Sequence, residues 1–274
     1  MEIILMAILR FTILGSGSSG GVPRLGDQVG GLWGACDPTN PKNNRRRCSL
    51  LVERITDAGR TRVLIDTSPD LRSQLLDAGV GSLDGVVYTH LHADHVHGID
   101  DLRMVVFNMR RRLPVWADVP TRDALISRFG YAFLQAEGSS YPAILDLNLI
   151  DGPITISGLG GEITLNPFPV KHGNIDSLGF RVADVAYLPD VSEIYEESWK
   201  AVENLDVWIL DALRREPHPT HTHFARSLEW MKRAAPKRGV LTNMHFDLDY
   251  QAVCDETEDH ITAAFDGMVI EVEG

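Results

Sequence analysis

The chain has 274 residues, of which 44% are hydrophobic and 23% charged, a composition typical of a globular protein that can bury a sizeable core. Lysine and arginine number 26 against 38 aspartate and glutamate residues, so the formal net charge of -12 argues against a general nucleic-acid binder. The three cysteines form no Cys-x-x-Cys pair, which supports neither a disulfide framework nor a thiolate zinc site and favours a cytoplasmic location. No apolar run reaches the about 20 residues that a membrane span needs.

Apolar runs of strand length and helical patterns divide the chain. The opening "MEIILMAIL" lacks a basic leader and a cleavage site, and we interpret it as strand or as an upstream start. The predicted strands lie at 9–15, 49–55, 62–67, 85–90, 114–118, 153–156, 162–170, 179–190, 206–213, 238–246 and 267–273. The predicted helices lie at 68–79, 94–107, 120–134, 191–204 and 223–236.

Strands without intervening helices cluster at 8–67 and 146–190, which does not fit a strictly alternating parallel sheet. An α/β fold of two mixed sheets with helices outside fits this order better. The chain shows no repeat and no linker, so we predict a single domain over residues 1–274 with an irregular insert at about 22–48.

The stretch "YTHLHADHVHG" (88–98) contains four of the ten histidines and directly follows an apolar run. Alternate residues of an extended chain share a face, so His90 and His92 are expected to converge on one point. Asp94 and His95 follow as the chain turns toward a helix, and they can be directed at a second point nearby. These nitrogen and oxygen donors predict a dinuclear site for Zn, Mn or Fe rather than Ca.

Further donors stand at the ends of later predicted strands. These are His172 in "PFPVKHG", Asp190 in "VAYLPD" and His245 in "GVLTNMH". Asp190 could bridge two ions, although each residue taken alone is also compatible with a cap or a turn. His97 breaks the ligand spacing, and we expect it to be a bystander.

The segments "THLHADH", "VKHG", "YLPD" and "LTNMH" together resemble the metallo-β-lactamase superfamily of dinuclear hydrolases. The flanking "LGSGSSGGVPR", "LIDTSPDLR", "HPTHTH" and "FDGMVIEV" are similar to the phosphoribosyl cyclic phosphodiesterases of carbon–phosphorus lyase pathways, relatives of ribonuclease Z. The resemblance extends over residues 11–272. It implies a four-layer αβ/βα sandwich, two divalent metal ions (Zn or Mn) and a phosphodiesterase activity.

The resemblance also implies a ligand set. One ion is expected on His90, His92 and His172, the other on Asp94, His95 and a late histidine, with Asp190 bridging. Relatives have "LTHxSH" where this chain has "LTNMHF", so Asn243 stands at the usual ligand position. Because residues two apart share a strand face, we predict that His245 replaces the missing ligand.

The related phosphodiesterases carry a cysteine-rich zinc-binding insert near the start. In the matching stretch "GLWGACDPTNPKNNRRRCS" only Cys36 of those cysteines remains, and Phe246 occupies the partner position. We therefore predict no structural zinc, and expect packing of Trp33 and turns at Pro38 and Pro41 to hold the insert. The basic run at 45–47 is expected to form a solvated face, or to place one arginine over a phosphate.

The stretch "HPTHTHF" supplies candidate proton donors for a leaving alkoxide. His221 resembles the non-ligand catalytic histidine of the phosphodiesterases, and His223 lies beside it, although both also fit the start of a helix. Asp94 can accept a proton from the attacking water. We expect Asp66 and Asp211 to orient metal-bound histidines.

Two other functions stay open at this point. One is a lactone or thioester hydrolase on the same dinuclear site, and the other is a non-hydrolytic accessory protein resembling the pyrroloquinoline-quinone pathway protein. The "SGSSGG" turn (16–21) lacks the Lys-Ser/Thr of a P-loop, so we interpret it as a tight turn. The expected partner is a small phosphodiester substrate, with nucleotide-like compounds included, rather than a long nucleic acid or a membrane. A homodimer is compatible with the sequence.

Overall fold

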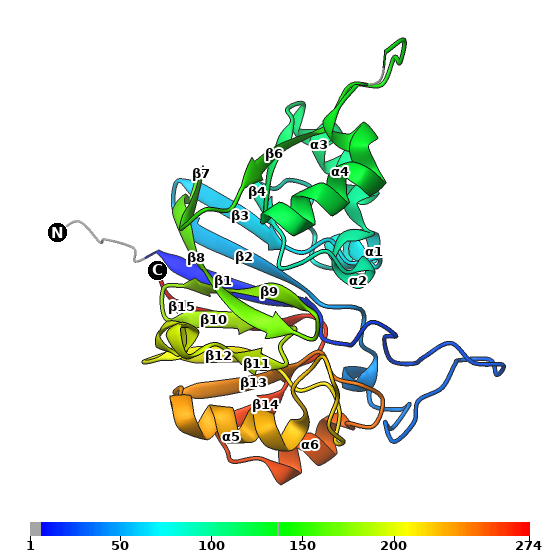
Figure 1. The fold of residues 1–274 in the computed structure, drawn as a ribbon, viewed down its shortest axis with the longest axis vertical. Coiled ribbons are helices and arrows are strands. Elements are labelled where there is room, and N and C mark those ends of the chain that lie inside the picture. Colours follow the sequence, from blue (N-terminus) through cyan, green and yellow to red (C-terminus); the bar gives the residue numbers. More distant parts are fainter. Residues whose placement is uncertain (1–6, 136) are drawn as a thin grey trace. The chain divides into compact units, whose positions relative to one another are not determined.

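The computed structural model describes residues 7–135 and 137–274, so residues 1–6 of the predicted opening strand lie outside it. The chain divides into two compact units, each with its own β-sheet (Figure 1). Unit 1 comprises Met1–Leu14, Ser49–Thr164 and Val269–Gly274, and unit 2 comprises Gly15–Cys48 and Leu165–Met268. That the whole chain forms a single domain stays a prediction.

The sheet of unit 1 has seven strands in the order β15-β1-β2-β3-β4-β5-β6. They are β1 (Ile8–Gly15), β2 (Ser49–Thr56), β3 (Gly59–Ile65), β4 (Gly85–Val87), β5 (Leu113–Ala117), β6 (Leu145–Leu149) and β15 (Met268–Glu273). Strands β2 and β3 are antiparallel, whereas β3, β4, β5 and β6 run parallel. The additional strand β7 (Ile154–Gly158) pairs with β8. The sheet is therefore mixed, as the uneven spacing of the predicted strands indicates.

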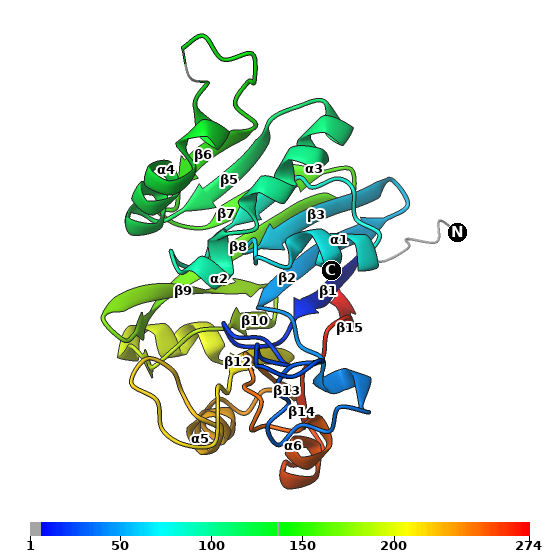
Figure 2. The ribbon, with the colours of Figure 1, turned by 90° about the vertical axis from the view of Figure 1, so that its right-hand side faces the viewer.

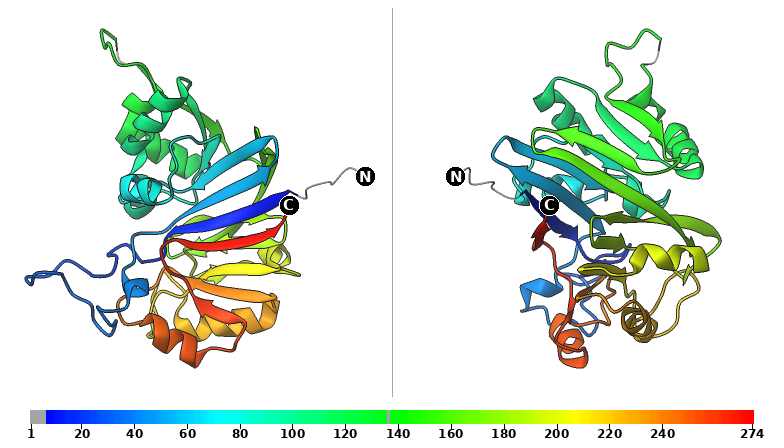
Figure 3. Two further views of the ribbon diagram at one scale, coloured as in Figure 1. Left: turned by 180° about the vertical axis from the view of Figure 1, so that it is seen from behind. Right: turned by 90° about the vertical axis from the view of Figure 1, so that its left-hand side faces the viewer.

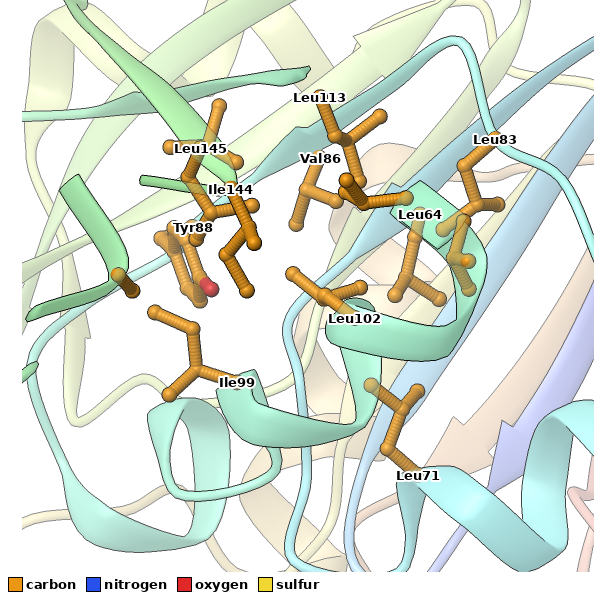
Figure 4. Close-up of a cluster of buried hydrophobic side chains, with 14 of the residues drawn as sticks. Leu64, Leu71, Leu83, Val86, Tyr88, Ile99, Leu102, Leu113, Ile144 and Leu145 are labelled. Carbon is orange, nitrogen blue, oxygen red and sulfur yellow. The ribbon is translucent and has the colours of Figure 1, made fainter. Parts of the chain in front are cut away.

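Helices pack against one face of the unit 1 sheet, and in Figure 2 α1 to α3 lie in front of its strands. They are α1 (Leu71–Asp77), α2 (Ala93–Val96), the 3-10 helix η2 (Ile99–Asp101), α3 (Leu102–Met109) and α4 (Val119–Phe133). Leu64 and Val86 of the strands and Leu71 and Leu102 of the helices are fully buried in the cluster between them (Figure 4). Each such side chain contributes about 1.5–3 kcal/mol on burial. This core fixes the end of β4, from which the histidine motif begins.

The sheet of unit 2 is ordered β11-β8-β9-β10-β12-β13-β14. Its strands are β8 (Gly161–His172), β9 (Ile175–Val182), β10 (Val185–Leu188), β11 (Glu193–Ile194), β12 (Val207–Asp211), β13 (Arg238–Thr242) and β14 (Ile261–Ala263). Strands β8 to β10 are antiparallel neighbours, while β10, β12, β13 and β14 run parallel. The carboxyl ends of parallel strands meet at one edge, where ligands bind in open α/β sheets. Asp190, Asp211 and Asn243 stand at that edge.

Two α-helices and two 3-10 helices complete unit 2, and Figure 3 shows α5 and α6 beside the last strands of its sheet. They are η1 (Pro41–Asn43), η3 (Glu196–Val202), α5 (Phe224–Ala234) and α6 (Tyr250–Glu256). The side chain of Asp249 caps α6 by accepting from Ala252 N at 3.0 Å. No helix within 7–135 and 137–274 is long and apolar enough to cross a membrane.

The helix predicted over 191–204 is wrong in type. The segment contains the short strand β11 and the 3-10 helix η3 instead. Ser198 Oγ donates to the carbonyl of Pro169 at 2.7 Å, and the ring of Trp199 packs edge-on against Trp208 and Trp230. These tertiary contacts override the helical spacing of the apolar residues.

The segment 16–48 contains η1 and isolated bridges but no strand of the two sheets. Arg45, near the end of this segment, is 1% exposed, so the expectation of a solvated basic run is wrong for this residue. Its Nη2 donates to Leu248 O at 2.7 Å and to Asn43 Oδ1 at 3.2 Å, and its Nη1 donates to His245 O at 3.2 Å. Nη1 also lies 3.8 Å from Cys36 Sγ. The guanidinium therefore fastens the segment to the loop at 245–248.

Candidate active site

In unit 1, the chain after β4 brings two imidazoles together, as the sequence predicts. His92 is extended (φ -68, ψ 152) and is the residue at which α2 begins. His90 Nε2 lies 3.0 Å from His92 Nδ1, and the two ring centroids are 4.6 Å apart. His90 is buried and His92 is half-buried. Two ring nitrogens that converge in this way suit a divalent metal ion.

A hydrogen-bond chain fixes which nitrogen of His90 faces this point. Thr89 Oγ1 donates to Asp66 Oδ2 at 2.7 Å, so it accepts from His90 Nδ1 at 2.9 Å. His90 Nε2 is thereby left with its lone pair. Hydrogen bonds of this kind orient histidine ligands in metal sites.

Asp66 holds His95 in the same manner. The fully buried His95 donates from Nδ1 to Asp66 Oδ2 at 2.7 Å, and Asp66 Oδ1 also accepts from Thr89 N at 2.8 Å. Burial raises the pKa of Asp66, and the bonds from His95 and Thr89 oppose this rise. Asp66 thus has the contact expected of an orienting carboxylate. Asp94 Oδ2 lies 3.6 Å from His95 Nε2, whereas His97 is exposed and packs edge-on against Phe129.

In unit 2, His172 and Asp190 lie close together after β8 and β10. His172 Nδ1 donates to Thr220 O at 2.6 Å, which leaves Nε2 unprotonated and 3.8 Å from Asp190 Oδ1. The ring of His221 lies 4.6 Å from that of His172, measured between centroids. His172, Asp190 and His221 each offer one ligand atom, and these atoms lie within 4.8 Å of one another. This group can hold a metal ion.

His221 is held by a second carboxylate, that of Asp211 at the end of β12. Nδ1 of His221 donates to Asp211 Oδ2 at 2.9 Å and lies 3.5 Å from Asp190 Oδ1. Burial raises the pKa of Asp211 to about 7, and the neighbouring His221 opposes the rise. The bond to Asp211 therefore fixes the orientation of the His221 ring.

Asn243, which stands where relatives have a histidine, turns its amide nitrogen toward the same carboxylates. Nδ2 donates to Asp211 Oδ1 at 3.2 Å and to Asp190 Oδ1 at 3.5 Å, while Oδ1 accepts from Cys48 Sγ at 3.9 Å. An amide nitrogen has no lone pair to offer a metal ion. Asn243 therefore acts as a hydrogen-bond donor between two aspartates.

The structure does not bring His245 or His223 into this group. His245 Nδ1 donates to Asp247 Oδ1 at 3.0 Å, and His223 is the residue before α5, with no side-chain capping bond. Neither joins a group of three metal donors in the part of the chain that the structure describes. Their predicted roles stay predictions.

The donors in both units suit a divalent ion. Each unit offers imidazole nitrogens and carboxylate oxygens, and no cysteine joins a group of three donors among the described residues. In each of His90, His95 and His172, Nδ1 forms a hydrogen bond with an oxygen atom. The candidate ligand atom of each ring is therefore Nε2. Zn and Mn both accept such a set.

Known proteins are similar to this chain in sequence and in fold. Residues 61–246 match the family model described as Beta-lactamase superfamily domain. An octanoyltransferase of Porphyromonas gingivalis is 33% identical over 262 residues, which cover 95% of this chain and 51% of that protein. A ribonuclease Z of Bradyrhizobium sp. is 33% identical over 153 residues, which cover 53% of this chain and 47% of that protein. The chain thus spans about half the length of the curated relatives it matches.

A solved structure matches nearly the whole chain. A new diphosphatase from the PhnP family is 33% identical with a TM-score of 0.86, and the match covers 98% of this chain and 99% of that one. The predicted fold class, two mixed β-sheets with flanking helices, is confirmed. The chain belongs to the beta-lactamase superfamily of metal-dependent hydrolases, in the branch of the PhnP family and ribonuclease Z.

Proposed function

We propose that the protein is a phosphodiesterase that uses two divalent ions, Zn or Mn, to hydrolyse a small cyclic phosphate or a nucleotide-like phosphodiester. The proposed ligands are His90, His92 and His172 for one ion, Asp94 and His95 for the other, and Asp190 for both. Support comes from the oriented histidines of each unit and from the family. The PhnP-family diphosphatase supports chemistry at phosphorus rather than at a lactone or thioester.

Bound divalent ions would activate a water molecule and offset the negative charge on the phosphoryl group. This matters for a chain of formal net charge -12, which needs local positive charge to accept an anionic substrate. Asp94, half-buried in the first turn of α2, is a candidate acceptor for the proton of the water.

The bond between His221 and Asp211 is the observation that carries the proposal. A leaving alkoxide needs a proton, and a protonated imidazole whose Nδ1 donates to a buried carboxylate can deliver the proton of its Nε2. His221 stands beside His172 and Asp190, so this proton donor lies next to metal donors of the same unit. We assign His221 as general acid and Asp211 as its positioning residue, and His223 remains the second candidate acid.

The test is metal analysis combined with a substrate panel. The panel contains bis-p-nitrophenyl phosphate, 2′,3′-cyclic nucleotides, cyclic phosphoribosyl esters, a lactone and a thioester. We expect turnover of the phosphodiesters that is lost on chelation and restored by Zn or Mn. Lactone or thioester turnover without phosphodiesterase activity would contradict the proposal, and a metal-loaded protein that turns over none of these would favour an accessory role.

The variant His221→Ala tests whether this histidine acts as a general acid or as a metal ligand. As general acid, its removal lowers turnover about 10²–10⁴-fold and leaves the metal content unchanged. A loss of metal would instead assign His221 as a ligand. Arg233→Ala is the matched control, since Arg233 lies in the same unit on the exposed side of α5.

A further inference from the structure

His218 stands next to the proposed general acid but is not used by the proposed chemistry. Its ring centroid lies 5.3 Å from that of His221. Its Nδ1 accepts from Thr220 N at 3.3 Å, so the proton of the neutral ring resides on Nε2. Among the described residues Nε2 has no hydrogen-bond partner, which leaves it as a donor for a ligand.

Arg214 carries a charge that no carboxylate of the described residues neutralises by direct contact. Its Nε donates to Glu216 O at 3.0 Å and its Nη2 to Pro217 O at 2.7 Å, so the guanidinium is fixed to the loop that leads to His218. None of the ion pairs formed by the described residues includes Arg214.

Arg24 approaches from the segment 16–48. Its guanidinium lies over the ring of Phe246, 4.7 Å from the centroid, and its Nε is buried without a hydrogen-bond partner among the described residues. Its backbone is paired with Leu32 in both directions, at 2.9 and 2.8 Å, which fixes where the side chain starts. A buried, unsatisfied guanidinium nitrogen is costly unless a ligand satisfies it.

Backbone contacts bring these groups into one patch. His245 N donates to Leu213 O at 2.8 Å, so the loop with Phe246 lies beside the loop with Arg214. Burial lowers the pKa of Arg24, with Asp247 opposing this shift and Arg214 adding to it. Burial also lowers the pKa of His218, and the neighbouring His221 and Arg214 add to that shift. Asp247 itself accepts from His245 Nδ1 and from Arg215 N. Cations gathered in an acidic chain indicate a site for an anion.

We propose that Arg24, Arg214 and His218 form an anion subsite beside His221, which binds a second phosphoryl group of the substrate. The inference rests on the proposed function and narrows it to phosphodiesters that carry a second phosphoryl group. Guanidinium groups bind phosphate oxygens through paired, charge-assisted hydrogen bonds, and an imidazole N–H adds a further donor.

Calorimetric titration of the metal-loaded protein tests the subsite. The probes are methylenediphosphonate, which has two phosphoryl groups and no hydrolysable bridge, and methylphosphonate, which has one. We expect Arg24→Ala and His218→Ala each to weaken methylenediphosphonate binding about 10-fold or more, because each removes a hydrogen bond to a charged group. Methylphosphonate binding should stay within about twofold of wild type.

Two further variants control the experiment. Arg233 lies over Trp199, 3.7 Å from the ring centroid, so Arg233→Ala removes a stacked arginine elsewhere in unit 2 and should change neither affinity. A Cβ on Gly20 would lie 2.9 Å from Arg24 Nε, so Gly20→Ala displaces this side chain without removing its charge. It should weaken methylenediphosphonate binding less than Arg24→Ala does.

The proposed subsite would be wrong if all variants bound methylenediphosphonate with equal affinity. It would also be wrong if Arg24→Ala and His218→Ala lost the same affinity for methylphosphonate as for methylenediphosphonate. The readout does not depend on turnover, so the two proposals can fail separately. If methylenediphosphonate binding depends on Arg24 and His218 while no phosphodiester is hydrolysed, the subsite stands and the proposed reaction is wrong.

Discussion

Asp211 accepts a hydrogen bond from His221 Nδ1 at 2.9 Å through one carboxylate oxygen, and the other oxygen accepts from Asn243 Nδ2 at 3.2 Å. In Asp211→Asn the acceptor for His221 is lost or replaced by a donor. We expect turnover of a phosphodiester to fall about 10²–10⁴-fold with little change in metal content. Steady-state kinetics and metal analysis of the same preparation check this. Asp184→Asn, at an exposed ion pair with Arg181, is the control.

Asn243→His should increase metal retention. The substitution places an imidazole where the amide nitrogen now faces Asp190 and Asp211, and so adds a ligand of the kind that relatives carry. We expect more metal per chain after dialysis, measured by atomic emission. An unchanged stoichiometry would show that the wild-type site is already complete.

His245→Ala tests the role assigned from sequence. That assignment predicts the loss of one ion, because His245 would replace the ligand missing at Asn243. The hydrogen bond from His245 to Asp247 competes with this role. Retention of both ions in His245→Ala would rule it out as a ligand.

Asp66→Ala should weaken metal binding without unfolding the protein. Asp66 orients His95 directly and His90 through Thr89, and loss of such a partner typically lowers metal affinity about 10–100-fold. Competition with a chelating dye measures the affinity. Asp66 has φ 64, so Asp66→Asn, which tolerates this conformation, serves as a second variant with less backbone strain.

Gly98→Ala should destabilise unit 1. A Cβ at Gly98 would lie 1.9 Å from the backbone oxygen of Ser68, so the segment after α2 would have to move. Overpacking of this kind costs about 1–3 kcal/mol of the free energy of unfolding. Urea unfolding measures it, with Gly130→Ala in α4 as the control, because a Cβ there meets nothing within 4 Å. Equal midpoints for both variants would contradict this reading of the packing.

The parts of the site that are contiguous in sequence could be predicted. The motif at 88–95 needs only one extended segment and one helix start, and its histidines do converge. The positions of His172 and Asp190 near strand ends are also predictable, because a buried strand is visible as an apolar run. The strands β6 and β14 were missed, since each is short and, in β6, mostly exposed.

The orientation of the side chains that follow β13 could not be predicted from sequence. Asn243 and His245 would share a face only on a straight strand, but β13 ends at Thr242 and Asn243 has φ 59. A left-handed residue breaks the alternation of side chains. His245 consequently turns to Asp247, a contact that depends on loop geometry and not on spacing.

The burial of Arg45 could not be predicted from sequence either, because its partners His245 and Leu248 lie about two hundred residues away along the chain. A guanidinium stays protonated at every physiological pH. Unlike a bound metal ion, it is part of the chain and cannot be removed by a chelator. The anchoring of residues 16–48 is therefore independent of metal supply. We therefore expect residues 16–48 to keep their contacts with residues 245–248 when the protein is treated with a chelator.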